Sequence, residues 1–169
     1  VFVRGAGVGL PMEGTGTHNV ASAALTLKPG ASFTGQFVFL LDNKGPAIAA
    51  GAATRVELNS SVVQWAQLGI ECVRCDFTST ASVWSHFPDD STNFADEDND
   101  AMYLSGGRHL VEDSVIANCK DDGIDTGTPE KFAGDGGSLV VDSCIIQRVQ
   151  HEAIALSSSP NGRRSARIR

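Results

Sequence analysis

The sequence contains no long hydrophobic run. Its longest apolar stretches, such as residues 37–41, are far too short to cross a bilayer, so no membrane span is expected. No basic segment leads into an apolar one near the start, so the sequence shows no recognisable signal peptide. Because the chain of 169 residues begins with Val1 rather than Met, we expect a mature product or a fragment.

The composition also lacks the extremes that define unusual protein classes. Aromatic residues make up 7% of the chain and charged residues 20%, while 41% is hydrophobic and only 4 residues are cysteine. These values exclude a disordered chain, a fibrous repeat and a small domain held together by disulfides. The length fits one soluble globular domain that can bury a core.

Basic residues are scarce in most of the chain, which carries a net charge of −7. Eleven of the 20 acidic residues lie between Asp89 and Asp125. Acidic surfaces repel phosphate backbones, so we expect no nucleic acid partner and instead cations or neutral polar ligands.

We interpret residues 159–169 as a basic tail that is truncated or frayed. Four of the 13 basic residues lie in its last seven positions, namely Arg163, Arg164, Arg167 and Arg169.

A short tetrad recurs along the chain, in which a small residue is followed in most copies by isoleucine. Its copies begin at Ala47, Gly69, Ala101, Gly123 and Ala153. A period of about 22 residues explains these positions if loops are inserted at 78–98 and 127–137, where polar and Gly-rich turn residues gather. The spacing therefore predicts stacked repeats with two inserted loops.

The apolar segments between the turns are short and rich in β-branched residues. Each lasts three to five residues, and polar turns at 59–61, 113–114 and 142–143 recur in phase with the tetrads. Such segments are strands, and no amphipathic helix separates them as a doubly wound α/β fold requires. We therefore predict an all-β, single-stranded parallel β-helix, a solenoid, over 31–158, with an N-terminal rung or cap over 1–30.

Alternation along each strand assigns side chains to the inside or the outside of the coil. Glu71, Tyr103 and Asp125 are expected to face outward in one column. The inward column contains one large apolar residue per rung, and its burial is expected to stabilise the stack. Its members are Ile48, Ile70, Met102, Ile124 and Ile154.

Three acidic residues precede successive tetrads and form one predicted column. Asp100 and Asp122 are one period apart, Glu152 follows after one further period and the second inserted loop, and Asp121 flanks the column. Neighbouring carboxylates repel, and three arrangements relieve the repulsion: a raised pKa, a shared cation, or hydrogen bonds from nearby donors. The first suits acid catalysis, the second suits metal binding, and the third is purely structural.

The repeats Asp121-Asp122-Gly123-Ile124-Asp125 and Asp-Ser-x-Ile resemble right-handed parallel β-helices of the pectin lyase-like superfamily, over about residues 30–158. Asn99-Asp100-Ala101 and Lys120-Asp121-Asp122-Gly123 resemble two motifs of its polygalacturonase-type glycoside hydrolases. This resemblance implies that Asp121 protonates the glycosidic oxygen while Asp100 and Asp122 activate water. The histidine of that family falls in the column of Glu152, and His151 lies one residue before it.

Calcium is the second possibility for the same column. Asp98 or Asp100, joined by Asp122 on the next rung, offers carboxylate oxygens to this cation. An EF-hand is excluded because Ala101 stands where that loop needs glycine. The resembled superfamily includes calcium-dependent pectate lyases, which also need a basic residue for proton removal, and Lys120 lies near the corresponding rung.

The cysteines give less functional information. Cys72 and Cys75 form a single CxxC motif, and Cys72 falls in an inward column, so a core thiol is favoured over a zinc ligand. Cys119 aligns with Trp65 and Val149 in another predicted interior column. Four cysteines allow three disulfide connectivities, and the sequence selects none.

These patterns predict a β-helix that binds or acts on an extracellular polysaccharide, as a glycoside hydrolase or a polysaccharide lyase. The cofactor is either calcium, held by Asp98, Asp100 and Asp122, or none. The expected catalytic residues are Asp100, Asp121 and Asp122. Substrate contacts are expected from Lys120, Tyr103, Asp125, His151 and Glu152. The alternative function is a non-catalytic structural or adhesive β-helix at the cell surface.

Overall fold

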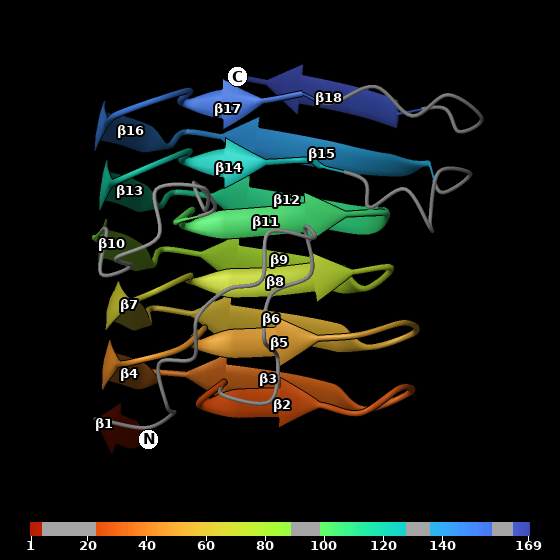
Figure 1. Cartoon of the computed structure of the whole chain (residues 1–169). Helices are drawn as coiled ribbons and strands as arrows, with labels where there is room; N and C mark the ends of the chain where they lie inside the picture. The colour runs from red at the N-terminus through yellow and green to blue at the C-terminus, as the bar shows by residue number, and fades with distance from the viewer. Residues whose placement is uncertain (5–22, 89–98, 128–135, 157–163) are drawn as a thin grey trace.

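A computed structural model of the chain describes residues 1–4, 23–88, 99–127, 136–156 and 164–169. These residues form short strands that pair in parallel in three sheets of six strands each. Consecutive strands belong to different sheets, so the chain winds as a right-handed parallel β-helix (Figure 1). The predicted fold class is confirmed.

Each rung contributes one strand to each of the three sheets, which we call A, B and C. In Figure 1, sheet A is at the left, and sheet B lies in front of sheet C. Sheet A consists of β1 (Phe2–Arg4), β4 (Phe39–Asn43), β7 (Val62–Ala66), β10 (Val83–Phe87), β13 (Val115–Cys119) and β16 (Ile145–Val149). Sheet B consists of β2 (Leu25–Leu27), β5 (Ile48–Ala50), β8 (Ile70–Val73), β11 (Met102–Ser105), β14 (Ile124–Asp125) and β17 (Ile154–Ala155). Sheet C consists of β3 (Ser32–Gln36), β6 (Arg55–Asn59), β9 (Asp76–Thr80), β12 (Gly107–Glu112), β15 (Gly137–Asp142) and β18 (Arg164–Ile168).

The tetrads form sheet B in the predicted register. Ile48 pairs with Ile70, Ile70 with Met102, Met102 with Ile124, and Ile124 with Ile154. The first four of these side chains are 0% exposed, and Ile154 is partly buried against them. Each fully buried aliphatic side chain contributes about 1.5–3 kcal/mol, so this column is a main source of stability.

Aliphatic residues and three large aromatic residues from sheets C and A fill the rest of the interior. Trp84, Phe77 and Phe87 are among the largest fully buried side chains. The ring of Trp84 packs edge-on against Phe77 with centroids 5.7 Å apart, and its Nε1 donates to the Ser79 Oγ at 2.9 Å. Within the described ranges, no helix has the length and apolar character needed to cross a membrane.

The turn between sheets C and A has the same backbone conformation in five rungs. Phe37, Ser60, Ala81, Asp113 and Ser143 have φ angles of 53°, 49°, 50°, 50° and 54°. This left-handed conformation is uncommon for residues with a Cβ, so its recurrence shows that the turn geometry is imposed by the stack. The polar turns recognised in the sequence lie at this corner of the coil.

A column of buried serines follows this turn, and we call it the serine ladder. The Oγ atoms of Ser61, Ser82 and Ser114 accept hydrogen bonds from the backbone N–H groups of Val38, Ser61 and Ser82, at 3.1, 3.1 and 3.2 Å. Each hydroxyl also donates to the carbonyl two residues earlier in its own rung. The ladder therefore satisfies buried backbone groups at every step.

The outer face of sheet B differs from the expectation drawn from strand alternation. Glu71 and Tyr103 are only 7% and 6% exposed, and Asp125 is half-buried. Equivalent side chains on adjacent rungs lie about 4.8 Å apart and cover one another. Gly127 also lies close, since a Cβ there would be 2.7 Å from the Tyr103 ring. The Tyr103 ring is therefore enclosed rather than presented on the surface.

Trp65 is a second departure, because its predicted interior position is wrong. It has a φ of 55° and is 50% exposed. Cys119 does lie in the interior and pairs with Val149 as predicted, but its partner on the preceding rung is Phe87. A single left-handed residue interrupts the alternation of the strand, so Trp65 points outward and Ala66 takes the inner position.

The two ends of the chain contribute regular strands. Within 1–30, β1 pairs with β4 and β2 pairs with β5, and within 159–169, β18 pairs with β15. The predicted insertion at 78–98 includes β10, which continues a regular rung. The rest of the predicted insertions at 78–98 and 127–137 lies mainly at 89–98 and 128–135, outside the described residues.

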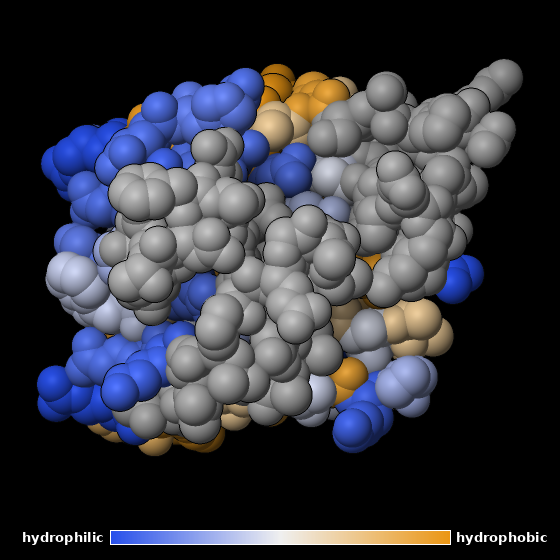
Figure 2. Space-filling model, viewed as in Figure 1, coloured by the Kyte–Doolittle hydropathy of each residue, from blue (hydrophilic) through white to orange (hydrophobic). Residues whose placement is uncertain are grey.

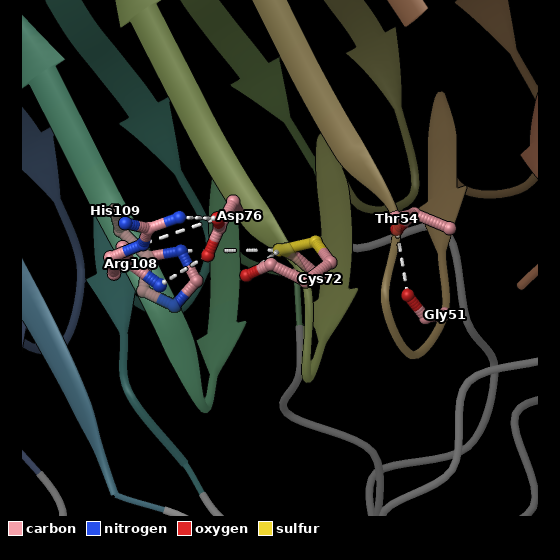
Figure 3. The surroundings of a disulfide bond; sticks show 7 residues. Gly51, Thr54, Cys72, Asp76, Arg108 and His109 are labelled. Atoms are coloured by element: carbon pink, nitrogen blue, oxygen red, sulfur yellow. Dashed lines mark hydrogen bonds and ion pairs between the residues drawn. A yellow bond between two sulfur atoms is a disulfide. The ribbon is translucent and has the colours of Figure 1, made fainter. Parts of the chain in front are cut away.

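The CxxC motif lies at the turn between sheets B and C (Figure 3). Cys72 and Cys75 are buried and joined by a disulfide, with Cα atoms 5.5 Å apart. The prediction of a core thiol at Cys72 is therefore wrong, because the tight turn brings the two cysteines within bonding distance. Cys119 and Cys144 are free, and burial raises the pKa of Cys119 to about 12.

Polar residues of β9 and β12, neighbouring strands of sheet C, lie beside this disulfide (Figure 3). Asp76 accepts hydrogen bonds from the Arg108 backbone N–H at 3.0 Å and from its Nε at 3.2 Å. These bonds lower the pKa of Asp76 and raise the pKa of Arg108. The Nδ1 atom of His109 is 3.9 Å from the Cys72 Sγ. An ion pair thus links the turn to the following rung.

Candidate functional site

Two aspartates of the predicted acidic column are buried. Asp100 is 1% exposed and Asp122 is 5% exposed. The Oδ1 of Asp100 accepts a hydrogen bond from the backbone N–H of Asp122 at 2.9 Å, and the Oδ1 of Asp122 accepts one from the N–H of Glu152 at 2.8 Å. Each carboxylate therefore binds the N–H group of the next rung, and hydrogen bonding relieves much of the expected repulsion.

Three neighbouring side chains are accessible, and together with Asp122 we call them the acidic edge. Its accessible members are Asp121, His151 and Glu152, whose side chains are 15%, 63% and 49% exposed. The His151 Nδ1 lies 3.1 Å from the Asp122 Oδ1 and 3.3 Å from the Asp121 Oδ1, and it contacts the Glu152 carboxylate. The corner between sheets A and B thus brings one imidazole against three carboxylates.

The charges of the acidic edge change the protonation of its members. Desolvation disfavours the charged imidazole of His151, but the carboxylates of Glu152, Asp122 and Asp121 outweigh it and raise the pKa. Desolvation raises the pKa of Glu152 as well, and the nearby Asp122 carboxylate adds to this shift. Both raised pKa values favour the protonated forms of His151 and Glu152, so the acidic edge can donate hydrogen bonds as well as accept them.

The acid–base roles implied by the resemblance meet a steric obstacle. Asp100 is enclosed, and one oxygen of Asp122 already accepts from Glu152. An inverting hydrolase needs two carboxylates that flank an open site for water, at a separation of about 6.5–9.5 Å. Of the three predicted catalytic residues, Asp121 is the most accessible in the described structure, although its side chain is only 15% exposed.

A different set of side chains at this edge has the spacing of metal ligands. One ligand atom each from Asp121, Asp122 and His151 lies within 4.8 Å of the others. Calcium prefers oxygen ligands alone, whereas a set that includes imidazole suits zinc and similar cations better. Of the residues predicted to hold calcium, Asp100 is buried and Asp98 lies outside the described residues.

The other predicted contact residues lie on two different surfaces. Lys120 immediately precedes the acidic edge and lines a groove beside sheet A. Tyr103 and Asp125 belong to β11 and β14 on the outer face of sheet B. The structure thus brings Asp121, His151 and Glu152 together and keeps Tyr103 enclosed.

A further polar column on sheet A was not predicted. Trp65, His86, Asn118 and Arg148 all have left-handed φ angles and contact one another in sequence order. Strand alternation assigns Trp65 to the core, and this assignment hides the column. Its members are 21, 32 and 30 residues apart, which is about one period with or without an inserted loop, but nothing in the sequence marks the left-handed backbone that turns them outward.

The fold and the acidic edge define the class of molecule: a right-handed parallel β-helix with a charged, accessible corner between sheets A and B. Comparison of the chain with family models, with curated proteins and with solved structures gives no match. Its function is therefore inferred from the side chains described above.

Proposed function

We propose that this chain is an extracellular carbohydrate-binding β-helix, related to the pectin lyase-like superfamily, that contacts a polysaccharide through the acidic edge. One observation carries the proposal: the exposed His151 is held against Asp121 and Glu152 on a rigid corner. Carboxylates and imidazole are good partners for sugar hydroxyls, because they accept and donate hydrogen bonds with little rearrangement. The stacked rungs offer a long, straight support for a polymer.

The rigidity of this edge supports binding. Asp122 touches both His151 and the backbone of Glu152, and Asp100 fixes Asp122 from the rung before. A site whose side chains are already oriented loses less conformational entropy when a ligand binds. The buried aspartates therefore support the accessible residues rather than contacting the sugar themselves.

The disulfide supports the extracellular location in the proposal. Disulfides form and persist in secreted and cell-surface proteins and are rare in reducing compartments. The Cys72–Cys75 bond is enclosed in the coil, consistent with a protein that folds under oxidising conditions.

A divalent cation is part of this proposal, held by Asp121, Asp122 and His151. When bound, it would supply positive charge that attracts sugar hydroxyl and carboxylate oxygens. Thermal unfolding with added Ca²⁺ or Zn²⁺ tests this part. At a cation concentration 100 times the dissociation constant, stabilisation is about 2.7 kcal/mol, and it is lost in Asp121→Asn. An unchanged melting temperature with both ions removes the cation from the proposal.

A binding assay with neutral and acidic oligosaccharides tests the function itself. Titration calorimetry is expected to show binding by the wild type and loss of binding in His151→Ala and Asp121→Asn. Asp113→Asn is a matched control, because Asp113 is exposed at the opposite corner and asparagine tolerates its left-handed φ of 50°. Cleavage of any oligosaccharide in the same panel would show that the protein is also an enzyme. If no oligosaccharide binds, the alternative of a purely structural or adhesive rod is favoured.

A further inference from the structure

The outer face of sheet A carries a column of left-handed residues. Asp42, Trp65, His86, Asn118 and Arg148 have φ angles of 56°, 55°, 62°, 59° and 54°. Each stands in the fourth position of a five-residue strand, where it interrupts alternation and directs its side chain outward. Left-handed φ is unfavourable for tryptophan, histidine and arginine, so five successive cases indicate a structure that the stack maintains.

The last four of these residues contact one another, and we call them the sheet A ladder. The ring of Trp65 stacks on His86, with centroids 4.5 Å apart and planes inclined by 25°. The Asn118 Nδ2 lies 3.2 Å from the His86 Nε2, and the Arg148 Nε donates to the Asn118 Oδ1 at 2.7 Å. The ladder thus continues over four rungs without a break.

The hydrogen bonds of the ladder have a defined direction. Because the Asn118 amide oxygen accepts from Arg148, its nitrogen must donate to His86, whose Nε2 is then an acceptor. The proton of the neutral imidazole therefore lies on Nδ1, which is 3.0 Å from the Ser85 Oγ. The Gln64 Nε2 donates to the same hydroxyl at 2.7 Å. This chain of donors fixes the orientation of every polar group in the ladder.

Arg148 is anchored through one nitrogen only. Its Nε donates to Asn118, and its two terminal amino groups make no hydrogen bond to any other residue that the structure describes. A guanidinium held in this way presents its remaining N–H groups as a planar fork, the geometry that matches a carboxylate. Its anchoring also lowers the entropy lost when a ligand binds.

A groove of about 670 Å³ runs beside the ladder. Besides the ladder, its lining includes Pro88, Lys120 and Gln150 and the less exposed Phe87, Cys119 and Val149. No acidic side chain is among the described residues that line it, although the whole chain has a net charge of −7. Figure 2 shows hydrophilic residues gathered along the left side of the view, where Figure 1 places sheet A.

We propose that this groove is a second binding site, distinct from the acidic edge, for a ligand that carries a carboxylate on a ring. The carboxylate binds the fork of Arg148 with Lys120 beside it, and the ring extends toward His86, while Trp65 lines the groove one rung beyond His86. An aromatic acid and a uronic acid sugar both have this chemistry. The ring of the ligand can pack against aromatic side chains of the groove. Its negative charge is favoured because the described lining includes two cations, Arg148 and Lys120, and no anion.

Matched ligand pairs test the proposal by titration calorimetry. Benzoate is compared with benzamide, and trigalacturonate with its carboxyl-reduced form, so that each pair differs in the charged group. At least one acid is expected to bind about tenfold or more tightly than its uncharged partner, as loss of a charge-assisted hydrogen bond implies. Binding by benzoate identifies an aromatic acid as the ligand class, and binding by trigalacturonate identifies a uronic acid sugar.

Variants of the ladder locate the binding. Arg148→Gln is expected to remove the preference for the acid, and Arg148→Lys to restore part of it, because lysine keeps the charge and loses the fork. Asn118→Gly removes the anchor of Arg148 without strain at a φ of 59° and is expected to weaken binding by a smaller factor. The control is Arg167→Gln, an exposed cation on sheet C.

The outcomes separate this inference from the proposed function. If neither acid binds, or if acid and uncharged partner bind equally, the groove is not a carboxylate site. The groove is likewise excluded if Arg148→Gln binds the acid as the wild type does. Binding of a neutral oligosaccharide that is lost on substitution of His151 would still support the acidic edge as a binding site, because His151 is not among the residues lining the groove. Circular dichroism checks that each variant keeps its β-structure.

Discussion

The two corners that flank sheet A satisfy buried backbone groups in different ways. At the corner between sheets C and A, the serine ladder accepts an N–H from the preceding rung and donates to a carbonyl of its own rung. At the corner between sheets A and B, Asp100 and Asp122 accept an N–H from the following rung. A hydroxyl can do both tasks and remains neutral, whereas an ionised carboxylate only accepts.

This difference decides which corner is chemically active. The hydroxyls of the serine ladder are neutral, so they place no buried charge near the surface of this corner. The exposed turn residue beside them, Ser60, bonds to its own neighbour Asn59. The buried Asp122 places negative charge just beneath the surface, where it acts on His151 and Glu152. A structural element that is itself charged can therefore prepare an accessible site in a way that a neutral one cannot.

Asp100→Ala is expected to produce the largest loss of stability in this comparison. The N–H of Asp122 would lose its acceptor in a buried place, which costs about 1.5–3 kcal/mol for a bond to a charged group. Urea unfolding measures the loss, and the m value shows whether the folded state stays compact. Asp100→Asn is the control, because its amide oxygen can still accept, and it is expected to recover most of the stability.

Ser82→Ala is expected to cost less, about 1 kcal/mol. It removes the acceptor for the Ser61 N–H, while the Thr80 carbonyl keeps its hydrogen bond from the Ser60 N–H. The same urea experiment provides the measurement. If Ser82→Ala proves as damaging as Asp100→Ala, charge does not distinguish the two corners.

The pH dependence of stability is expected to differ between wild type and His151→Gln. The pKa of His151 is raised from its ordinary value of 6.5 in the folded state, so its stabilising contribution is fully present below that value. The contribution disappears as the pH rises through the folded pKa. His151→Gln should therefore lose more stability at pH 5 than at pH 9. An equal loss at both pH values contradicts the assigned contacts with the acidic edge.

Arg108→Gln is expected to give the opposite pH dependence and the smallest effect. The pKa of Asp76 is lowered from its ordinary value of 3.8 by its hydrogen bonds to Arg108, so this pair stabilises the fold above that value. Its contribution is lost as the pH falls through the lowered pKa. Thermal melts of wild type and variant should differ at pH 6 and converge near pH 2. Arg108 is highly exposed, so the difference at pH 6 is small.

The repeat made most of the fold predictable. A fixed spacing places Ile48, Ile70 and Met102 on adjacent rungs, and parallel pairing leaves one register that buries all of them. Trp65 was misplaced because a left-handed residue has no signature in the pattern of apolar and polar residues. Its effect, a shift of alternation by one residue, becomes visible only when the backbone is known.

The candidate site was less predictable for a different reason. The spacing of Asp100, Asp122 and Glu152 identified neighbouring rungs but not burial, which depends on how tightly the corner packs. The sequence left three remedies for carboxylate repulsion open, and the structure shows hydrogen bonding to backbone N–H groups for the two buried members. Tyr103 is enclosed by the side chains and backbone of adjacent rungs, a packing effect that strand alternation ignores.

The position of the disulfide has a mechanical consequence. Cys72 and Cys75 are separated by three positions and belong to the same rung, so the bond crosses a corner of the coil and connects no two rungs. Cohesion along the axis therefore depends on backbone hydrogen bonds and side-chain columns between neighbours. Under tension applied at the chain ends, rungs should peel away one at a time. The disulfide would shorten the length released at its own rung only slightly, and it would not slow the separation of that rung from the next.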